Sequence, residues 1–184
     1  MPVTRPCPPC PQTPSVVILE AMDTLPSFTY QRFDSRTDAR SAFDTVIETA
    51  QRQIRLYDRD GYFYGLDRPV VAEHFGRLLL RSPQTSIRIV LQQTHLLRHN
   101  CPRLMALMQR HGSQFEVRRL DEKYRGYERG LLLADDAVVM RRPHFEQNLA
   151  FWDVGEAEIS NAVSLFTELW DHNPEVVSAS VTGL

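Results

Sequence analysis

The sequence lacks long apolar runs. No stretch approaches the roughly 18 consecutive apolar residues that a membrane-spanning helix needs. Its first 14 residues also lack the apolar centre of a signal peptide. We therefore expect a cytoplasmic protein without a membrane span. Its 184 residues, 42% of them hydrophobic, are enough for one domain with a buried core.

Cysteine is scarce as well, with three residues in the chain. Cys7 and Cys10 lie among prolines, and no second cysteine pair or histidine pair follows at zinc-finger spacing. His95 and His99 are four residues apart, but the glutamate of a His-Glu-x-x-His site is missing. A glycine-rich phosphate loop and a Gly-x-Ser-x-Gly elbow are also missing. We therefore predict no disulfide framework, no metal site and no cofactor.

Lysine is nearly absent, because 20 of the 21 basic residues are arginines. The net charge of −2 conceals an uneven distribution: residues 77–142 contain thirteen basic and six acidic residues, a balance of +7, and the rest of the chain carries −9. Arginine suits bidentate recognition of phosphate or carboxylate. The alternative is that these arginines pair with acids on solvated helix and strand faces.

Hydrophobic periodicity predicts one domain over residues 27–172, between a proline-rich tail at 1–26 and a short tail at 173–184. The clearest helix signal is the stripe Ala39, Ala42, Phe43, Val46 and Ile47. We predict strands at about 28–33, 54–58, 86–92, 114–120, 130–134 and 137–141, and helices at about 36–53, 69–81, 101–111 and 156–170. This order favours an α/β fold in which helices flank a mixed β-sheet.

One part of this order is more specific. A strand at 115–118, a hydrophobic strand at 131–135 that ends in an acid, a further strand, and a helix that ends at 166–170 follow one another. The chain resembles a half-domain of the phospholipase D superfamily, as in small uncharacterised bacterial proteins. The resemblance implies a homodimer, because half-domains of that family pair to bring two equivalent strand ends together.

The catalytic motif of that family, His-x-Lys-x4-Asp, is broken here. If Asp135 is set on the family's aspartate, the histidine position falls on Glu128 and the lysine position on Gly130, and Arg142-Pro143-His144 replaces a small polar turn. A carboxylate cannot take the place of a histidine that attacks phosphorus, and it repels an anionic phosphodiester. Loss of the lysine removes a donor to the phosphoryl oxygens. These changes favour a pseudoenzyme.

The predicted strand ends could gather Asp58 and several polar residues of the later strands into one pocket. In such a pocket arginine side chains would hold phosphate, and an aromatic residue of the 62–64 loop would stack on a base. The candidate ligand-binding residues are Glu128, Arg129, Asp135, Arg141, His144 and Tyr62. The alternative is that Asp135 belongs to a hairpin turn and that the arginines form surface ion pairs.

The leading hypothesis is a non-catalytic module that binds a protein partner or a phosphate-bearing ligand. The alternatives are a phosphodiesterase-like enzyme with an atypical site and a nucleic-acid-binding protein. The net charge of −2 disfavours a broad non-specific nucleic-acid surface.

Overall fold

The computed structural model describes residues 30–124, 126–173 and 175–178. Its elements are β1 (Gln31–Phe33), α1 (Arg36–Thr49), β2 (Gln53–Asp58), α2 (Pro69–Arg81), β3 (Ser86–Leu91), α3 (His95–Asn100), α4 (Pro102–His111), β4 (Phe115–Arg119), β5 (Gly130–Ala134), β6 (Val138–Arg142), β7 (Ala150–Asp153) and α5 (Glu156–Asp171). Short 3-10 turns lie at Gly112–Gln114 and Glu122–Tyr124. Among the described residues, no helix is both long and apolar enough to cross a bilayer.

The described strands form one seven-stranded sheet in the order β1-β7-β6-β5-β2-β3-β4. β2, β3 and β4 are parallel, whereas β5 runs antiparallel to β2 and begins an antiparallel half that continues through β6, β7 and β1. Tyr57 near the end of β2 lies opposite Leu131 near the start of β5. The start of β5 is therefore beside the carboxyl end of β2. The prediction of a mixed sheet flanked by helices is confirmed.

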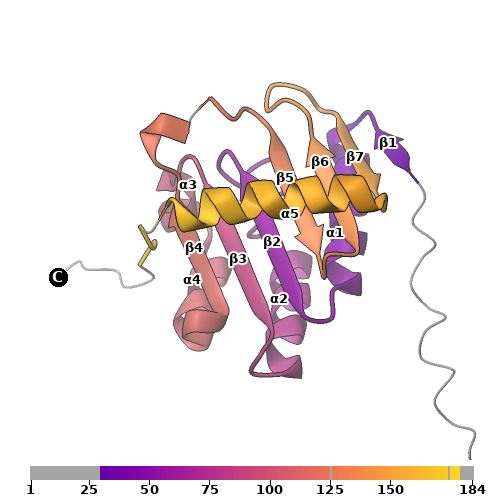
Figure 1. The fold of residues 1–184 in the computed structure, drawn as a ribbon. Coiled ribbons are helices and arrows are strands. Elements are labelled where there is room, and N and C mark those ends of the chain that lie inside the picture. Colours follow the sequence, from indigo (N-terminus) through magenta and orange to yellow (C-terminus); the bar gives the residue numbers. More distant parts are fainter. Residues whose placement is uncertain (1–29, 125, 174, 179–184) are drawn as a thin grey trace, which may run out of the picture.

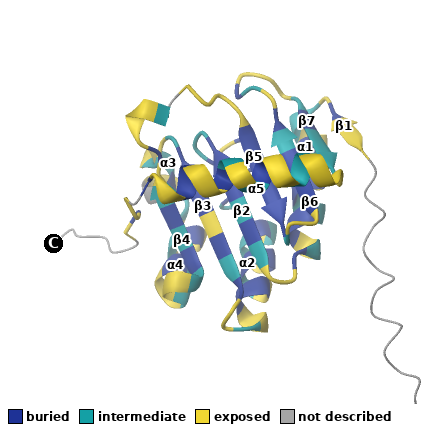
Figure 2. Ribbon diagram, viewed as in Figure 1, coloured by how far each residue is buried: buried dark blue, intermediate teal, exposed yellow. Residues whose placement is uncertain are grey.

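Two apolar layers cover the sheet. α1, α2 and α4 lie on one face, and α5 crosses the other face (Figure 1). Successive side chains of a strand point to opposite faces, so Leu132 of β5 packs in the first layer, whereas Leu131 and Leu133 pack in the second with Phe166 of α5. The outward side of α5 is exposed, as Figure 2 shows in yellow.

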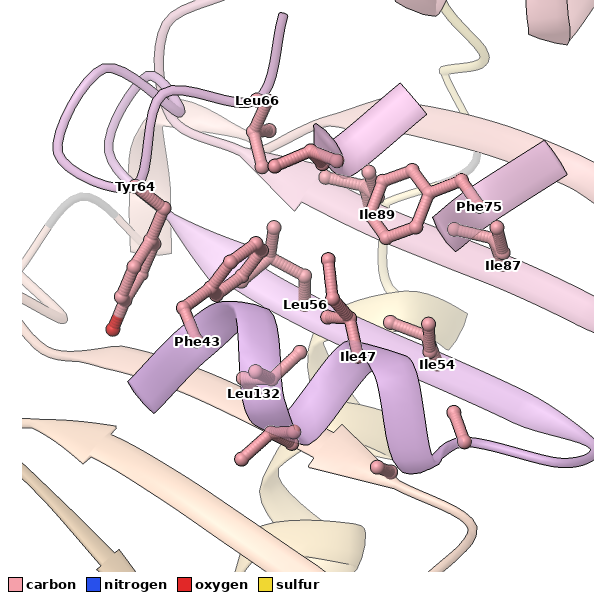
Figure 3. Packing of buried hydrophobic residues seen from close by; sticks show 14 of the residues in the cluster. Phe43, Ile47, Ile54, Leu56, Tyr64, Leu66, Phe75, Ile87, Ile89 and Leu132 are labelled. Carbon is pink, nitrogen blue, oxygen red and sulfur yellow. The ribbon is translucent and has the colours of Figure 1, made fainter. Parts of the chain in front are cut away.

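The predicted stripe on α1 is buried along its whole length. Ser35 caps this helix, because its side chain accepts a hydrogen bond of 3.0 Å from the Asp38 N–H. Figure 3 shows Phe43 and Ile47 of α1 facing Leu56 of β2 and its neighbours. α1 ends at Thr49 rather than at the predicted 53, since β2 already begins at Gln53.

Two elements were not predicted. β7 pairs with β6 and with β1, and its four residues are too short a run, with too little alternation, to read as a strand in sequence. α3 is a six-residue helix before Pro102. The predicted tail at 1–26 lies outside the described residues. Beyond α5, Val177 is buried, and its N–H donates to the carbonyl of Val117 at the edge of the sheet.

Candidate functional site

Glu128 and His144, two of the predicted site residues, meet where β5 begins and β6 ends. The Nε2 atom of His144 lies 2.7 Å from Oε2 of Glu128, and Nδ1 accepts a hydrogen bond of 3.1 Å from the backbone N–H of Glu146. Because Nδ1 accepts, the neutral imidazole carries its proton on Nε2 and donates it to the carboxylate. Both ring nitrogens are therefore engaged, and neither presents a free lone pair to an incoming phosphorus.

Gly130, set by the sequence at the family's lysine position, is closely surrounded by other side chains. A Cβ atom here would lie 3.1 Å from Cβ of Arg142 and 3.5 Å from both Oδ1 of Asp58 and the ring of Phe145. Arg142 is directly opposite Gly130 in the pairing of β5 with β6, so its Cβ is fixed by the sheet. A side chain at Gly130 would therefore require Arg142 to shift by a few tenths of an ångström.

Arg142 is held at this end of the sheet by a buried network. Its Nη1 atom lies 3.7 Å from Oδ1 of Asp58, a residue with no exposed surface. The guanidinium also donates to the backbone carbonyls of Phe145 and Gln147 and lies 3.7 Å from the centre of the Phe63 ring. Because the Arg142 guanidinium makes these contacts within the protein, few of its N–H groups remain to bind a ligand.

Burial disfavours the charged forms of both Asp58 and Arg142. It raises the pKa of Asp58 to about 6, although the Arg142 guanidinium pulls that pKa down. The pKa of Arg142 is lowered, again mainly by burial, with Asp58 opposing the shift. Both partners are thus displaced toward their neutral forms, which is the signature of a desolvation cost that the Coulomb attraction only partly offsets.

Tyr64 adds a third buried polar group. Its ring stacks on Phe43 at 4.6 Å, and Figure 3 shows its hydroxyl directed away from the apolar side chains. Within the described chain neither the Tyr64 hydroxyl nor Oδ1 of Asp58 has a hydrogen-bond partner. Burial and the charge of Asp58 raise the pKa of Tyr64, so this phenol stays protonated. The cluster of Asp58, Tyr64 and Arg142 therefore contains two buried oxygen atoms without a hydrogen-bond partner in the described chain.

Arg129 and Arg141, two further predicted residues, line one cavity on the opposite face of the sheet. The cavity has a volume of about 490 Å³ and lies between α5 and the strands β5, β6 and β7. Tyr30, Tyr57 and Phe151 contribute aromatic surface to its wall. Gly130 and Arg142 also border this cavity, but Glu128 does not. Strand alternation explains the separation of Arg129 from Glu128, because neighbouring residues of an extended chain point to opposite faces.

The two arginines of this cavity differ in their contacts. Arg141 forms ion pairs with Glu158 of α5 and, at 3.5 Å, with Asp153 of β7. Arg129 is exposed, and no described residue forms a hydrogen bond or an ion pair with its guanidinium. Arg129 is therefore the cation available to a ligand, and Arg141 becomes available only if a ligand displaces an acid.

Asp135 lies at the far end of β5, away from the other candidates. Its carboxylate accepts hydrogen bonds of 2.5, 2.8 and 2.8 Å from the backbone N–H groups of Gln51, Arg52 and Gln53. Asp135 and Asp136 both have positive φ values, 52° and 55°, as the two central residues of a type I′ hairpin turn. The predicted hairpin is confirmed, and the geometry assigns Asp135 to the joint between α1 and β2 rather than to a pocket.

Tyr62 is also separate from the arginines with which it was grouped. It is 61% exposed and lines a second cavity, beside α1 and α3, together with Arg40 and Arg68. The guanidinium of Arg36 lies 4.3 Å from the centre of its ring. The six predicted residues thus occupy four places: the Glu128–His144 pair, the cavity under α5, the hairpin turn, and the second cavity.

The buried residues of the site were harder to select from sequence. Asp58 and Arg142 were recognised as strand-end residues but were not among the six selected, and Tyr64 was recognised only as part of an aromatic loop. The available signal was the acid that directly follows a buried strand, since buried acids need a nearby cation. In the described part of the chain, no group of three or more His, Cys, Asp or Glu residues could hold a metal ion.

The arrangement of the sheet and helices is shared with solved proteins. TrmBL2, an archaeal chromatin protein whose structure shows a novel mode of DNA binding, matches with a TM-score of 0.62 at 18% identity, over 82% of this chain and 55% of that one. The chain thus spans about half of that protein. Nuc from Salmonella typhimurium, a phospholipase D family member, has a TM-score of 0.52 at 12% identity over 82% and 98% of the two chains. NucT from Helicobacter pylori has 0.55 at 11% over 79% and 97%.

These likenesses define the class of the protein by its fold: it is a phospholipase D-like α/β domain, as the sequence predicted. At such low identity these likenesses show the fold and do not establish a function. Residues 35–178 match the family described as Domain of unknown function (DUF7931), and because this match covers more than half of the sequence, the chain belongs to that family. None of the curated protein sequences matches it.

Proposed function

We propose that this chain is a non-catalytic phospholipase D-like module that binds a phosphate-bearing ligand in the cavity under α5. Arg129 carries this proposal, because it is an exposed cation with no ion-pair partner among the described residues and lines a cavity of about 490 Å³. That volume is typical of small-molecule sites. Phosphate is the expected group, since a guanidinium donates two parallel hydrogen bonds to it.

Aromatic residues in the same cavity support a ligand with a planar ring. Tyr30 and Phe151 stack on each other with ring centres 5.8 Å apart, and Tyr57 also lines the cavity. Stacking on such rings adds affinity without demanding one particular base. A nucleoside monophosphate combines the phosphate and the ring, and is the ligand class that we propose.

The proposal of a non-catalytic module rests on the residues around the start of β5 and the end of β6. A phosphohistidine mechanism needs an imidazole nitrogen with a free lone pair and a cation beside the attacked phosphorus. In the described structure His144 has both nitrogens bonded, and Arg142 is committed to Asp58 and to carbonyl groups. Glu128 adds negative charge where a phosphodiester would have to approach.

A nucleic-acid ligand is a second candidate, which the likeness to a DNA-binding chromatin protein favours. Several arginines of the basic segment are already paired, with Arg118 bound to Glu116 and Arg119 to Glu175. A nucleic acid would have to compete with these acids. Each phosphate that an arginine neutralises releases counterions from the nucleic acid, so binding would weaken steeply as salt rises. Titration with single-stranded oligothymidine at several salt concentrations tests this candidate directly.

The homodimer and the cytoplasmic location also stay predictions. Light scattering measures the mass of the protein in solution and so tests the homodimer.

The proposed ligand class is tested by isothermal titration calorimetry with adenosine 5′-monophosphate. We expect the wild type to bind and Arg129→Gln to bind at least about tenfold more weakly, because a charge-assisted bidentate contact is lost. Arg110→Gln is the matched control, since Arg110 is an exposed arginine on α4, on the other face of the sheet. Equal affinity in all three proteins, or no binding by the wild type at millimolar nucleotide, would contradict the proposal.

A further inference from the structure

The second cavity lies on the α1 side of the sheet and is separate from the cavity under α5. It has a volume of about 520 Å³ and is bounded by the loop after β2 and by α3. Leu66, Leu96 and Cys101 provide its apolar wall, and Arg40 and Arg68 stand at its polar side. It therefore combines a cationic edge with an apolar interior.

Three arginines converge at that edge. A Cβ atom on Gly65 would lie 3.2 Å from Nη2 of Arg40 and 3.2 Å from Cδ of Arg68, so the two side chains meet over this glycine. The φ of Gly65 is +66°, a conformation that favours glycine, which keeps the space between them open. Burial lowers the pKa of Arg40, and the charges of Arg36 and Arg68 lower it further. The fold thus concentrates positive charge here.

Two of the three arginines, Arg36 and Arg40, lie at the start of α1, and this position adds to the concentration of positive charge. Arg36 is the first residue of the helix and Arg40 follows one turn later, where the helix dipole already places positive charge. Cations are unfavourable at this end of a helix, and violations of such local rules tend to mark functional sites. The Nε atom of Arg36 is buried and has no hydrogen-bond partner in the described chain.

The nearby acids only partly neutralise the cluster. Asp44 binds Arg68 with both carboxylate oxygens, at 2.5 and 2.8 Å. Asp67 is used at the start of α4, where it accepts the N–H of Arg103 and pairs with the Arg103 guanidinium. Arg40 donates only to the backbone carbonyls of the loop, those of residues 62 and 63. Arg40 therefore has no carboxylate partner within the described chain.

We propose that this cavity binds a small organic anion of single charge, with its carboxylate on Arg40 and its apolar body against Leu66 and Leu96. Asp60 and Asp67 also line the cavity, and their negative charges disfavour a phosphate dianion. The apolar wall favours a ligand with a hydrocarbon body over a bare ion. This site is independent of Arg129 and of the proposed nucleotide cavity.

The test compares three probes by calorimetry: octanoate, 1-octanol, which has the same chain without the charge, and inorganic phosphate, which has charge without the chain. We expect octanoate to bind at least tenfold more tightly than either of the others. Arg40→Gln should weaken octanoate at least tenfold, Arg40→Lys should restore part of the affinity, and Arg36→Gln should weaken it about threefold. Arg110→Gln is the control and should bind as the wild type does.

Arg40→Gln also removes two hydrogen bonds to the loop and can perturb the fold. Leu96→Trp is therefore the second variant, because it fills the cavity from α3 and leaves every arginine in place; it should abolish octanoate binding. Octanoate binding that is unchanged in Leu96→Trp, equal binding of 1-octanol, or no binding of octanoate by the wild type would overturn the proposal.

Discussion

The two ends of β5 use their polar side chains in different ways. At its far end, Asp135 binds three consecutive backbone N–H groups and joins the hairpin to the turn between α1 and β2. At its start, Glu128 pairs with His144, and Gly130 makes room for Arg142. At the far end of β5, a side chain thus links two segments of backbone. At its start, charged side chains pack against one another.

This difference separates a structural role from the proposed non-catalytic one. An aspartate that satisfies three N–H groups stabilises the fold whether or not the protein is an enzyme. Asp135 therefore stabilises the joint between α1 and β2, and the start of β5 is occupied by paired and buried charged side chains.

The largest effect should follow the loss of Arg142. Arg142→Met leaves the Asp58 carboxylate buried without a cation, which we expect to cost about 3–5 kcal/mol of unfolding free energy. Urea denaturation measures it. In the double variant with Asp58→Asn the loss should be clearly smaller than the sum of the two single losses, and strict additivity would show that the two side chains are not coupled.

The pH dependence of stability should come next in size. Burial raises the pKa of Asp58 to about 6 from an ordinary value of 3.8, so the folded protein binds this proton more tightly than the unfolded chain does. The contribution of Asp58 is therefore most favourable below about pH 4 and is lost as the pH rises through about 6. The change is on the order of 3 kcal/mol.

The measurement is the difference in unfolding free energy between the wild type and Asp58→Asn at several pH values. The asparagine variant cannot titrate at this position, and the other groups of the two proteins are the same. The difference should move in favour of the wild type as the pH falls from 7 to 4. A constant difference over that range would mean that Asp58 titrates normally.

A smaller loss should follow removal of the carboxylate at the far end of β5. Asp135→Ala deletes three hydrogen bonds and places alanine at a φ of 52°, which together should cost about 2 kcal/mol. Asp135→Asn keeps an acceptor and tolerates this φ, so it should lose roughly half as much. The binding of adenosine 5′-monophosphate should stay unchanged in both variants; a tenfold loss would place Asp135 in the ligand site after all.

Most of the fold could be predicted from hydrophobic periodicity, because apolar residues recur at regular intervals along an element that buries one face. The stripe on α1 and the hydrophobic run of β5 are examples, and both elements form as predicted. β7 escaped prediction because only Ala150 of its four residues is fully buried. Its pairing with β6 and β1 is decided by tertiary contacts, which a local pattern does not contain.

The site was predicted less completely. Proximity of Glu128 and His144 follows from strand ends that meet at one edge of the sheet, and this contact forms. The separation of Arg129 from Glu128 depends on the face of the sheet to which each side chain points. The position of Tyr62 depends on the path of a loop. A pairing register shifted by one residue reverses every face, so sequence alone could not assign these residues to one cavity or to two.

The most direct test of the account is hydrolysis of bis(p-nitrophenyl) phosphate by the wild type and by His144→Gln. We predict that both proteins release p-nitrophenolate at the rate of buffer alone, because both nitrogens of His144 are engaged and Arg142 is held by Asp58. Release by the wild type that is lost in His144→Gln would contradict the account, and would make His144 the nucleophile of an active enzyme.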